Sequence, residues 1–308
     1  MLGKSLTSIF LPSVAALYVL SFKLECVNGQ GYSYMYVDRV LHSYGRQLQW
    51  TWCVDISDQL SVSERNRLCG DPDGDIQVDH ADVRVEMAEF WREQSHDGSL
   101  QEMMLDENAD ELDQEERPEI LAMLPDLKGK RVLELGAGIG RFTPSLARQA
   151  DHVTAVDFME SFIKKNEEAN RHLGNINFLQ ADVTRLDLPQ ESVDVVFSNW
   201  LMMYLADEEV SALAAKVLSW LTEGGYFFFR ESCFQKSGNK KRSFNPTFYR
   251  CPADYSAIFS AVTQDARYVY EEQFAGRAVK TYIKRKKNEN QLCWLLRKVR
   301  RDGSHEVK

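Results

Sequence analysis

Short apolar runs alternate with longer amphipathic stretches over the second half of the chain. The strand-like runs comprise residues 131–135, 152–157, 176–180, 193–199, 225–231, 268–274 and 292–299. Helix-like stretches separate the early runs at residues 141–149, 160–173 and 207–221. Apolar runs joined by helices are typical of buried parallel strands, whereas the last two runs have the spacing of an antiparallel pair at a sheet edge. We therefore predict an α/β fold with a seven-stranded, doubly wound, Rossmann-like sheet.

Two helical segments precede this alternation. Residues 87–91 look helical, and residues 110–124 form an amphipathic pattern that Pro125 ends. Pro118 interrupts that pattern and indicates a kink or a late helix start.

A glycine-rich turn, GAGIG, directly follows the first parallel strand. Gly136, Gly138 and Gly140 give a backbone without Cβ obstruction, and the helix that follows presents unpaired N–H groups. The turn predicts a nucleotide-type ligand without naming it. A dinucleotide-binding Rossmann domain is the main competitor, but the turn lacks the final glycine at the usual spacing and no second catalytic domain follows.

Acidic residues at strand ends favour S-adenosylmethionine, which has no pyrophosphate to cradle. Glu134 lies inside the first strand, Asp157 ends the second where it can take ribose hydroxyls, and Asp182 follows the third where it can accept from the adenine amino group. The predicted cofactor-binding residues are Glu134, Gly136, Ala137, Gly138, Gly140, Asp157, Phe158, Asp182, Val183 and Asn199.

Charge and cysteine usage exclude several other classes. A net charge of −9 and a pI near 5.3 argue against general nucleic-acid binding, although basic stretches at residues 236–250 and 280–301 leave a local place for an anion. The six cysteines show no CxxC pair and no zinc-ligand spacing, so we expect no metal, no disulfide scaffold and a reducing, cytoplasmic compartment for the catalytic domain. The acidic stretch at residues 69–75 lacks the terminal glutamate of a calcium loop.

The N-terminal region follows a different pattern. Residues 1–25 form an apolar leader that could be a signal or an anchor, so membrane contact through residues 5–22 stays open. Residues 26–85 read as an extension without an assigned role. Residues 86–299 are the predicted catalytic domain with its N-terminal lid helices, and residues 300–308 are a basic and polar tail.

Several segments together resemble a known family. They read VLELGAGIGRFT, VTAVDF, VDVVFSNWLMMYL, LTEGGYFFFRESC, NPTFYRCPADY and KKNENQLCW, with EMMLDENADELDQEERPEILAMLP upstream. The chain resembles the phosphoethanolamine N-methyltransferases of plants and nematodes over roughly residues 90–299, and in particular the domain that performs the first methylation. The resemblance implies a class I S-adenosylmethionine-dependent methyltransferase fold and methylation of phosphoethanolamine to phosphomonomethylethanolamine, which feeds phosphocholine and phosphatidylcholine synthesis. It also implies a second methyltransferase acting in sequence.

The same resemblance suggests roles for individual side chains. It implies amine positioning or proton relay by Tyr204, with Ser95 and His96 on a segment that covers the cofactor. Tyr249 and Arg250 match the phosphate-contacting region, and Lys287 is a candidate for the remaining positive charge. Trp200 is expected either to face the ammonium group as a cation–π surface or to pack at the sheet edge.

Two further functions remain open on the sequence. One is a methyltransferase-like protein that holds the cofactor without turnover. The other is a membrane-tethered amine methyltransferase that acts on another substrate, for which the apolar leader would serve as the tether.

Overall fold

The chain separates into two compact units, residues 1–77 and residues 78–308, each described here by itself. The computed structural model describes residues 18–26, 33–43, 46–55, 80–94, 98–240 and 247–301. Residues 1–17 of the apolar leader and all of residues 56–79 therefore lie outside the described residues. Within the described part of the chain, no helix has the length and apolar character that crossing a bilayer requires.

The first unit contains a three-stranded antiparallel meander. Its strands are β1 (Tyr18–Cys26), β2 (Ser33–Ser43) and β3 (Arg46–Asp55), and β2 pairs with both neighbours. The sequence analysis predicted no strands here.

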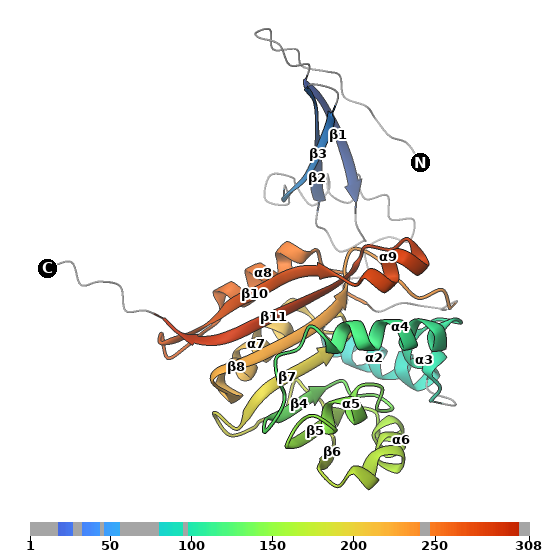
Figure 1. Ribbon diagram of the computed structural model, residues 1–308, viewed down its shortest axis with the longest axis vertical. Helices are drawn as coiled ribbons and strands as arrows, with labels where there is room; N and C mark the ends of the chain where they lie inside the picture. The colour runs from blue at the N-terminus through green and yellow to red at the C-terminus, as the bar shows by residue number, and fades with distance from the viewer. Residues whose placement is uncertain are drawn as a thin grey trace, which may run out of the picture. The chain divides into compact units, whose positions relative to one another are not determined.

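The second unit is built on one mixed sheet whose strand order is β6-β5-β4-β7-β8-β11-β10-β9 (Figure 1). The strands are β4 (Arg131–Leu135), β5 (His152–Asp157), β6 (Ile176–Gln180), β7 (Val193–Asn199), β8 (Leu221–Ser232), β9 (Thr263–Gln264), β10 (Tyr268–Ala278) and β11 (Gln291–Arg300). The strands from β6 to β8 are parallel to one another, and β11 enters antiparallel between β8 and β10. The seven predicted strands are confirmed, and β9 adds a two-residue eighth strand at the edge.

Helices cover the sheet between these strands. They are α2 (His80–Gln94), α3 (Leu100–Met104), α4 (Ala109–Leu121), α5 (Thr143–Ala147), α6 (Glu160–Asn170), α7 (Asp207–Trp220), α8 (Pro252–Ala261) and α9 (Lys280–Lys286). The helix predicted at residues 141–149 is shorter than expected, and Pro118 lies inside α4 rather than at its start. The helices α8 and α9 were not predicted.

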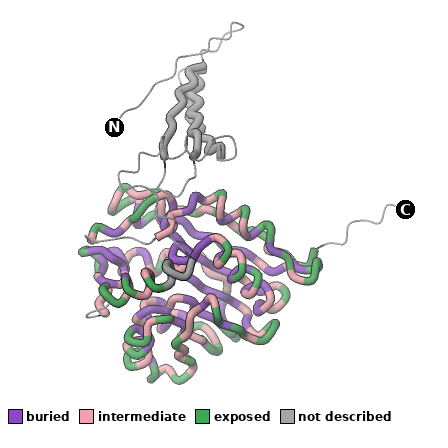
Figure 2. Tube along the Cα trace, turned by 180° about the vertical axis from the view of Figure 1, so that it is seen from behind, coloured by how far each residue is buried: buried purple, intermediate pink, exposed green. Residues whose placement is uncertain are grey.

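Alternating strand residues fill two separate cores, because successive side chains of a strand point to opposite faces. On β8, Phe227 and Phe229 pack with α7 and α8, whereas Phe228 packs on the opposite side with α4, α5 and α9. Buried positions accordingly run along the central strands, and exposed positions concentrate on the outer helices (Figure 2). Since both faces are covered, ligand access is left to the edge where the parallel strands end.

Candidate active site

A cavity of about 350 Å³ lies at the carboxyl ends of β4, β5 and β7, between the sheet and helices α2 and α3. This volume falls at the lower end of the usual range for small-molecule sites. Eleven of the residues proposed from the sequence lie in its wall. They are Glu134, Gly136, Ala137, Asp157, Phe158, Asp182, Val183, Asn199, Trp200, Tyr204 and Tyr249.

The glycine turn shapes the cavity without every glycine lining it. The N–H groups of Gly136 and Ala137 both donate to the Val156 carbonyl at 2.9 Å, which ties β4 to β5. Gly138, at φ +56°, donates its N–H to Asp157, and Gly140, at φ +90°, allows α6 to approach closely. Neither Gly138 nor Gly140 lies in the cavity wall, and their assignment to cofactor binding stays a prediction.

Two buried carboxylates stand behind the turn. Burial raises the pKa of Asp157 to about 6, although the N–H groups of Met159 and Gly138 oppose that shift. Burial also raises the pKa of Glu134 to about 8, while a hydrogen bond from the Thr143 hydroxyl at 2.6 Å favours the charged form. Both groups are acceptors in a low-dielectric pocket, where a ligand ammonium or hydroxyl would be bound strongly.

Asp182 occupies the neighbouring part of the wall after β6. Its Oδ1 accepts from both the backbone N–H and the hydroxyl of Thr184, at 2.9 and 2.8 Å. This Asx-type turn fixes the carboxylate and leaves Oδ2 free of those two bonds.

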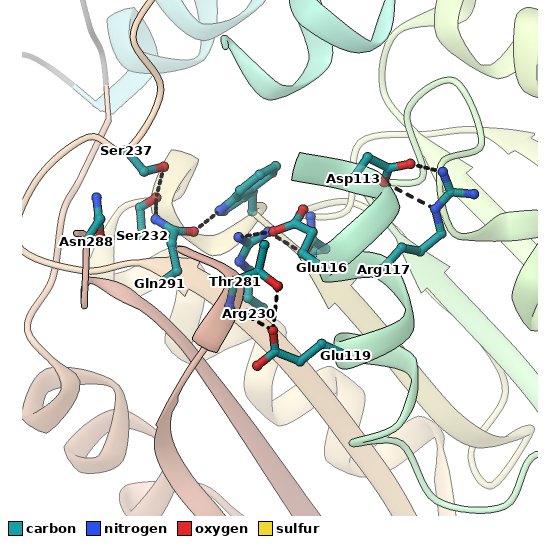
Figure 3. A network of polar contacts seen from close by, with 12 residues as sticks. Asp113, Glu116, Arg117, Glu119, Arg230, Ser232, Ser237, Thr281, Asn288 and Gln291 are labelled. Carbon is teal, nitrogen blue, oxygen red and sulfur yellow. Dashed lines mark hydrogen bonds and ion pairs between the residues drawn. The ribbon is translucent and has the colours of Figure 1, made fainter. Parts of the chain in front are cut away.

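Trp200 begins the turn after β7 at φ +58° and lines the cavity. Its indole N–H donates to Gln291 at 2.8 Å, and the Arg230 guanidinium carbon lies 3.7 Å from the ring centroid. Arg230 is itself buried and paired with Glu116 (Figure 3). Arg141 also lies over this ring, at 5.3 Å, so the cation–π partners of Trp200 within the described residues are two internal arginines.

Tyr204 closes the same turn, on the short 3₁₀ helix η3 (Met202–Tyr204). Its ring meets the edge of Trp91 at a centroid separation of 5.3 Å, and Met203, Leu105 and Phe90 complete the same apolar cluster. This packing places an aromatic hydroxyl residue in the wall between α2 and the strand ends.

Two buried residues, Glu231 and Arg250, hydrogen-bond to the backbone of the turn at residues 201–205. Glu231 accepts hydrogen bonds from the N–H groups of Leu201, Met202 and Met203, at 2.9–3.2 Å. Arg250 donates to the carbonyls of Met202 and Leu205 and pairs with Asp207.

Arg250 is consequently placed differently from its predicted role. Its guanidinium is occupied by protein acceptors and it lies outside the cavity wall, so the expected direct phosphate contact is corrected to a contact with the turn that carries Tyr204. Its neighbour Tyr249 does reach the wall.

The remaining sequence candidates lie away from the cavity or cannot be placed. Lys287 ends α9 in a left-handed conformation and is exposed, which corrects its proposed phosphate contact. The adjacent Lys286 pairs with the buried carboxylate of Asp106 instead. Ser95 and His96 lie outside the described residues.

Sequence reasoning missed several wall residues. Arg141 follows the last glycine of the turn, and a cation at the start of an otherwise apolar helix was an available signal. Ser232 and Ser237 also line the cavity, with their hydroxyls 3.3 Å apart, and Ser232 accepts from Gln291 (Figure 3). Nothing in the local sequence indicates that the two serines meet.

The sheet order, the glycine turn after β4 and the acidic residues after β5 and β6 together define a class I S-adenosylmethionine-dependent methyltransferase domain. The donor set fits that cofactor, because Asp157 and Asp182 offer acceptors for adenosine while Glu134 offers one for an ammonium group. A methyltransferase-domain family model matches residues 132–225.

Comparison with known proteins narrows the class. The chain is 52% identical over 219 residues to phosphoethanolamine N-methyltransferase 3 of Arabidopsis thaliana, covering 70% of this chain and 45% of that protein. It is 40% identical over 228 residues to phosphoethanolamine N-methyltransferase 1 of Caenorhabditis elegans, covering 70% and 48%. A solved structure of Haemonchus contortus phosphoethanolamine N-methyltransferase 1, in complex with phosphoethanolamine and S-adenosylhomocysteine, superposes with a TM-score of 0.71 at 37% identity, covering 75% of this chain and 52% of that one.

The chain belongs to the phosphoethanolamine N-methyltransferase family. It spans about half the length of the relatives it matches.

Proposed function

We propose that this chain transfers a methyl group from S-adenosylmethionine to the nitrogen of phosphoethanolamine and releases phosphomonomethylethanolamine. The observation that carries this proposal is one cavity whose wall carries both acidic acceptors, Asp157 and Glu134, and aromatic hydroxyl residues, Tyr204 and Tyr249. Membership of the family supports the same substrate.

The chemistry requires an uncharged amine. A primary amine with a pKa near 10 is almost wholly protonated at pH 7, which corresponds to about 4 kcal/mol for removing the proton. The cofactor supplies an electrophilic methyl group on a sulfonium, and the positive charge of that sulfonium lowers the pKa of the nearby amine. The protein must still orient the nitrogen and give the departing proton an acceptor.

Tyr204 is the candidate for orienting the nitrogen, because its wall position lies between the strand ends and α2. A tyrosine hydroxyl can accept a hydrogen bond from the amine and pass a proton to water. As a neutral phenol it is a weak base near pH 7, so we assign it positioning and relay rather than final proton acceptance.

The apolar cover of the cavity would exclude water around the reacting nitrogen. Met87 and Trp91 from α2, together with Met103 and Leu105 from α3 and its C-terminus, form this cover. Exclusion of water strengthens every electrostatic contact in the cavity and favours the neutral amine.

The phosphate end of the substrate is assigned to the hydroxyl-bearing side of the cavity. Tyr249, Ser232 and Ser237 all lie in the cavity wall, and the hydroxyls of the two serines are 3.3 Å apart. Arg250 and Glu231 act here as positioning residues, since they fix the turn 201–205 from outside the wall.

A methyl-transfer assay on the full chain tests the proposal. Labelled S-adenosylmethionine is offered with phosphoethanolamine, its monomethyl form, free ethanolamine or phosphatidylethanolamine. We expect label on phosphoethanolamine alone, with one methyl group per molecule. Turnover of phosphatidylethanolamine instead would identify a lipid methyltransferase, and cofactor binding without any turnover would identify a non-catalytic protein; either result overturns the proposal.

The product assignment carries a proposal about partners. If this chain adds one methyl group, a second methyltransferase must supply the later two before phosphocholine forms.

We assign the catalytic function to residues 86–299 and leave residues 1–85 outside it. The test compares the activity of the full chain with that of a chain that starts at residue 78, the boundary between the two compact units.

A further inference from the structure

The chain reverses direction between α3 and α4 at a strained leucine. Leu105 has the left-handed backbone angles φ +51° and ψ +38°, which are unfavourable for a residue with a branched side chain. Its side chain is buried in the cavity wall, where it packs with Tyr204 and Met203. Such a backbone conformation persists only where the surrounding contacts fix it. The contacts around Leu105 therefore show what holds this part of the wall in place.

The reversal at Leu105 brings parts of the cavity wall together. Met103 of α3 lies against Gly138, because a Cβ added to that glycine would overlap the Met103 side chain. The Leu105 carbonyl accepts from the Lys240 amide at 3.0 Å, and a Cβ added to Gly238 would overlap this carbonyl. The reversal thus connects the apolar cover of the cavity both to the glycine turn and to the segment that contains Gly238.

Asp106, the residue after Leu105, is anchored to helix α9. Its Oδ2 accepts from the Lys286 ammonium, and its Oδ1 accepts from the Asn108 amide at 3.0 Å. The Asp106 side chain is only 1% exposed and that of Lys286 is 18% exposed, so the pair is shielded from water. Removal of one member of such a pair leaves an unpaired buried charge. The reversal is therefore coupled to a helix none of whose residues lies in the cavity wall.

A second ion pair between α9 and α4 provides a comparison. Glu115 pairs with Lys284 at 3.7 Å, but the Lys284 side chain is 74% exposed. Exposed pairs of this kind contribute little to stability. The start of α9 is also held by Glu119 of α4, which accepts from two backbone N–H groups of α9. The docking of α9 on α4 thus has supports besides Asp106 and Lys286.

We propose that Asp106 and Lys286 are positioning residues for cofactor binding. Their ion pair fixes the reversal at Leu105 and thereby keeps Met103 and Leu105 over the bound cofactor. The pair acts through Leu105, because neither Asp106 nor Lys286 lies in the cavity wall. The inference rests on the proposed function only in taking the cofactor as the ligand, and it requires no methyl transfer.

Stopped-flow fluorescence on the full chain tests the proposal by measuring the dissociation rate constant of S-adenosylhomocysteine, with Trp91 and Trp200 in the cavity wall as reporters. We expect Lys286→Met to raise this rate constant about tenfold, the factor that one charge-assisted hydrogen bond supplies at the low end of its range. Lys286→Arg keeps the charge and a donor, so it should restore slow dissociation. Lys284→Met is the matched control, since it removes an exposed lysine of the same helix, and it should leave the rate constant unchanged.

A double variant tests whether the two residues act as a pair. Asp106→Asn alone should also speed dissociation, and Asp106→Asn combined with Lys286→Met should be no faster than either single variant, because both changes remove the same contact. The double variant leaves no unpaired charge, so it carries the test where a single variant fails to fold. Thermal unfolding of each variant separates a loss of stability from faster dissociation.

Three results overturn the proposal. Dissociation at the wild-type rate from Lys286→Met, or from the double variant, would show that the pair does not hold the cover, whatever the loss of stability. An equal acceleration in Lys284→Met would assign the effect to the docking of α9 as a whole. Additive effects of the two single changes would show that Asp106 and Lys286 act separately. Loss of methyl transfer with the expected dissociation rates would refute the proposed function and leave this assignment standing.

Discussion

The amide nitrogen of Gly138 lies 2.8 Å from Oδ2 of Asp157 and donates a hydrogen bond to it. This contact joins the turn after β4 to the end of β5, where Asp157 lines the cavity. Oδ1 of Asp157 accepts from the Met159 amide at 2.9 Å, so the carboxylate is oriented by two backbone donors. A carboxylate held in this way keeps lone pairs for the ribose hydroxyls that an adenosine ligand would present.

Nucleoside binding should therefore depend on the ionisation of Asp157. Its pKa is raised to about 6, so the charged form is complete above that pH and is lost as the pH falls through it. We expect the affinity for 5′-methylthioadenosine, which lacks the amino-acid arm, to fall by up to about tenfold per pH unit below pH 6. Calorimetry between pH 5 and 8 measures this, and Asp157→Asn should abolish the dependence. A flat wild-type profile would contradict the role of the carboxylate.

Ionisation of Glu134 should make the free energy of unfolding decrease as the pH rises. Its pKa rises from 4.5 to about 8 on folding, so the folded chain holds the proton more tightly, and the stability linked to Glu134 is full below about pH 4.5 and declines as the pH rises to 8. The free energy of unfolding of the wild type minus that of Glu134→Gln should accordingly decrease from pH 5 to 8, by at most about 1.4 kcal/mol per unit. Urea unfolding of both chains measures it; a constant difference would exclude the shift.

Gly140 should tolerate a side chain less well than another glycine of similar backbone conformation. At φ +90° an added Cβ would overlap the Asn166 side chain, whose amide donates to Thr143 at 2.9 Å. We expect Gly140→Ala to cost roughly 2–4 kcal/mol from strain and overpacking. Gly174→Ala, at φ +78° with open space around it, should cost about 1–2 kcal/mol. Equal losses in thermal or urea unfolding would show that backbone strain alone matters.

Arg250→Lys should separate substrate turnover from cofactor binding. Lysine keeps the charge but lacks the fork that reaches the carbonyls of Met202 and Leu205, so the turn carrying Tyr204 loosens. We expect kcat/KM for phosphoethanolamine to fall about tenfold or more, with S-adenosylhomocysteine affinity within twofold. Arg267→Lys, on an exposed arginine paired with Asp265, is the control. A parallel loss of cofactor affinity would refute a role confined to the turn.

Tyr204→Phe should act on the chemical step. It removes one hydroxyl and keeps the ring that packs on Trp91. We expect kcat to fall by roughly 10²-fold, the lower end of what proton-transfer groups contribute, with little change in cofactor binding. Tyr226→Phe, outside the cavity wall, provides the control for removal of a tyrosine hydroxyl. Normal kcat in Tyr204→Phe would leave amine positioning to another group.

The parallel strands could be read from the chain because each is a short apolar run between helix-like stretches, and the central ones, β4, β5 and β7, are largely buried. The bounds of β4, β5, β6 and β7 agree with the predicted ranges. Helix α9 could not be read in the same way, because its N-terminal N–H groups are capped by Glu119 and not by a neighbour in sequence. A cap supplied from 161 residues away leaves no local signal.

Some residues of the candidate site could likewise be placed from the sequence, and others could not. Glu134, Asp157 and Asp182 were predictable because strand ends in a doubly wound sheet meet at one edge, so position along the chain fixes position in space. Arg250 was misplaced because its residue type is equally suited to a phosphate and to backbone carbonyls, and only the fold brings the turn 202–205 within its reach.

The sequence by itself determined the class of fold, the glycine turn and the acidic edge of the cavity, because these follow from local periodicity and from the order of the strands. Only the tertiary structure decided which groups each buried charged residue contacts. Arg141, Arg230 and Glu231 are buried, and the partner of each buried charge comes from a distant part of the chain: Asp113 and Glu116 from α4, and the amides of the turn after β7. A buried charge is stable only where such partners meet it, and that meeting is a property of packing.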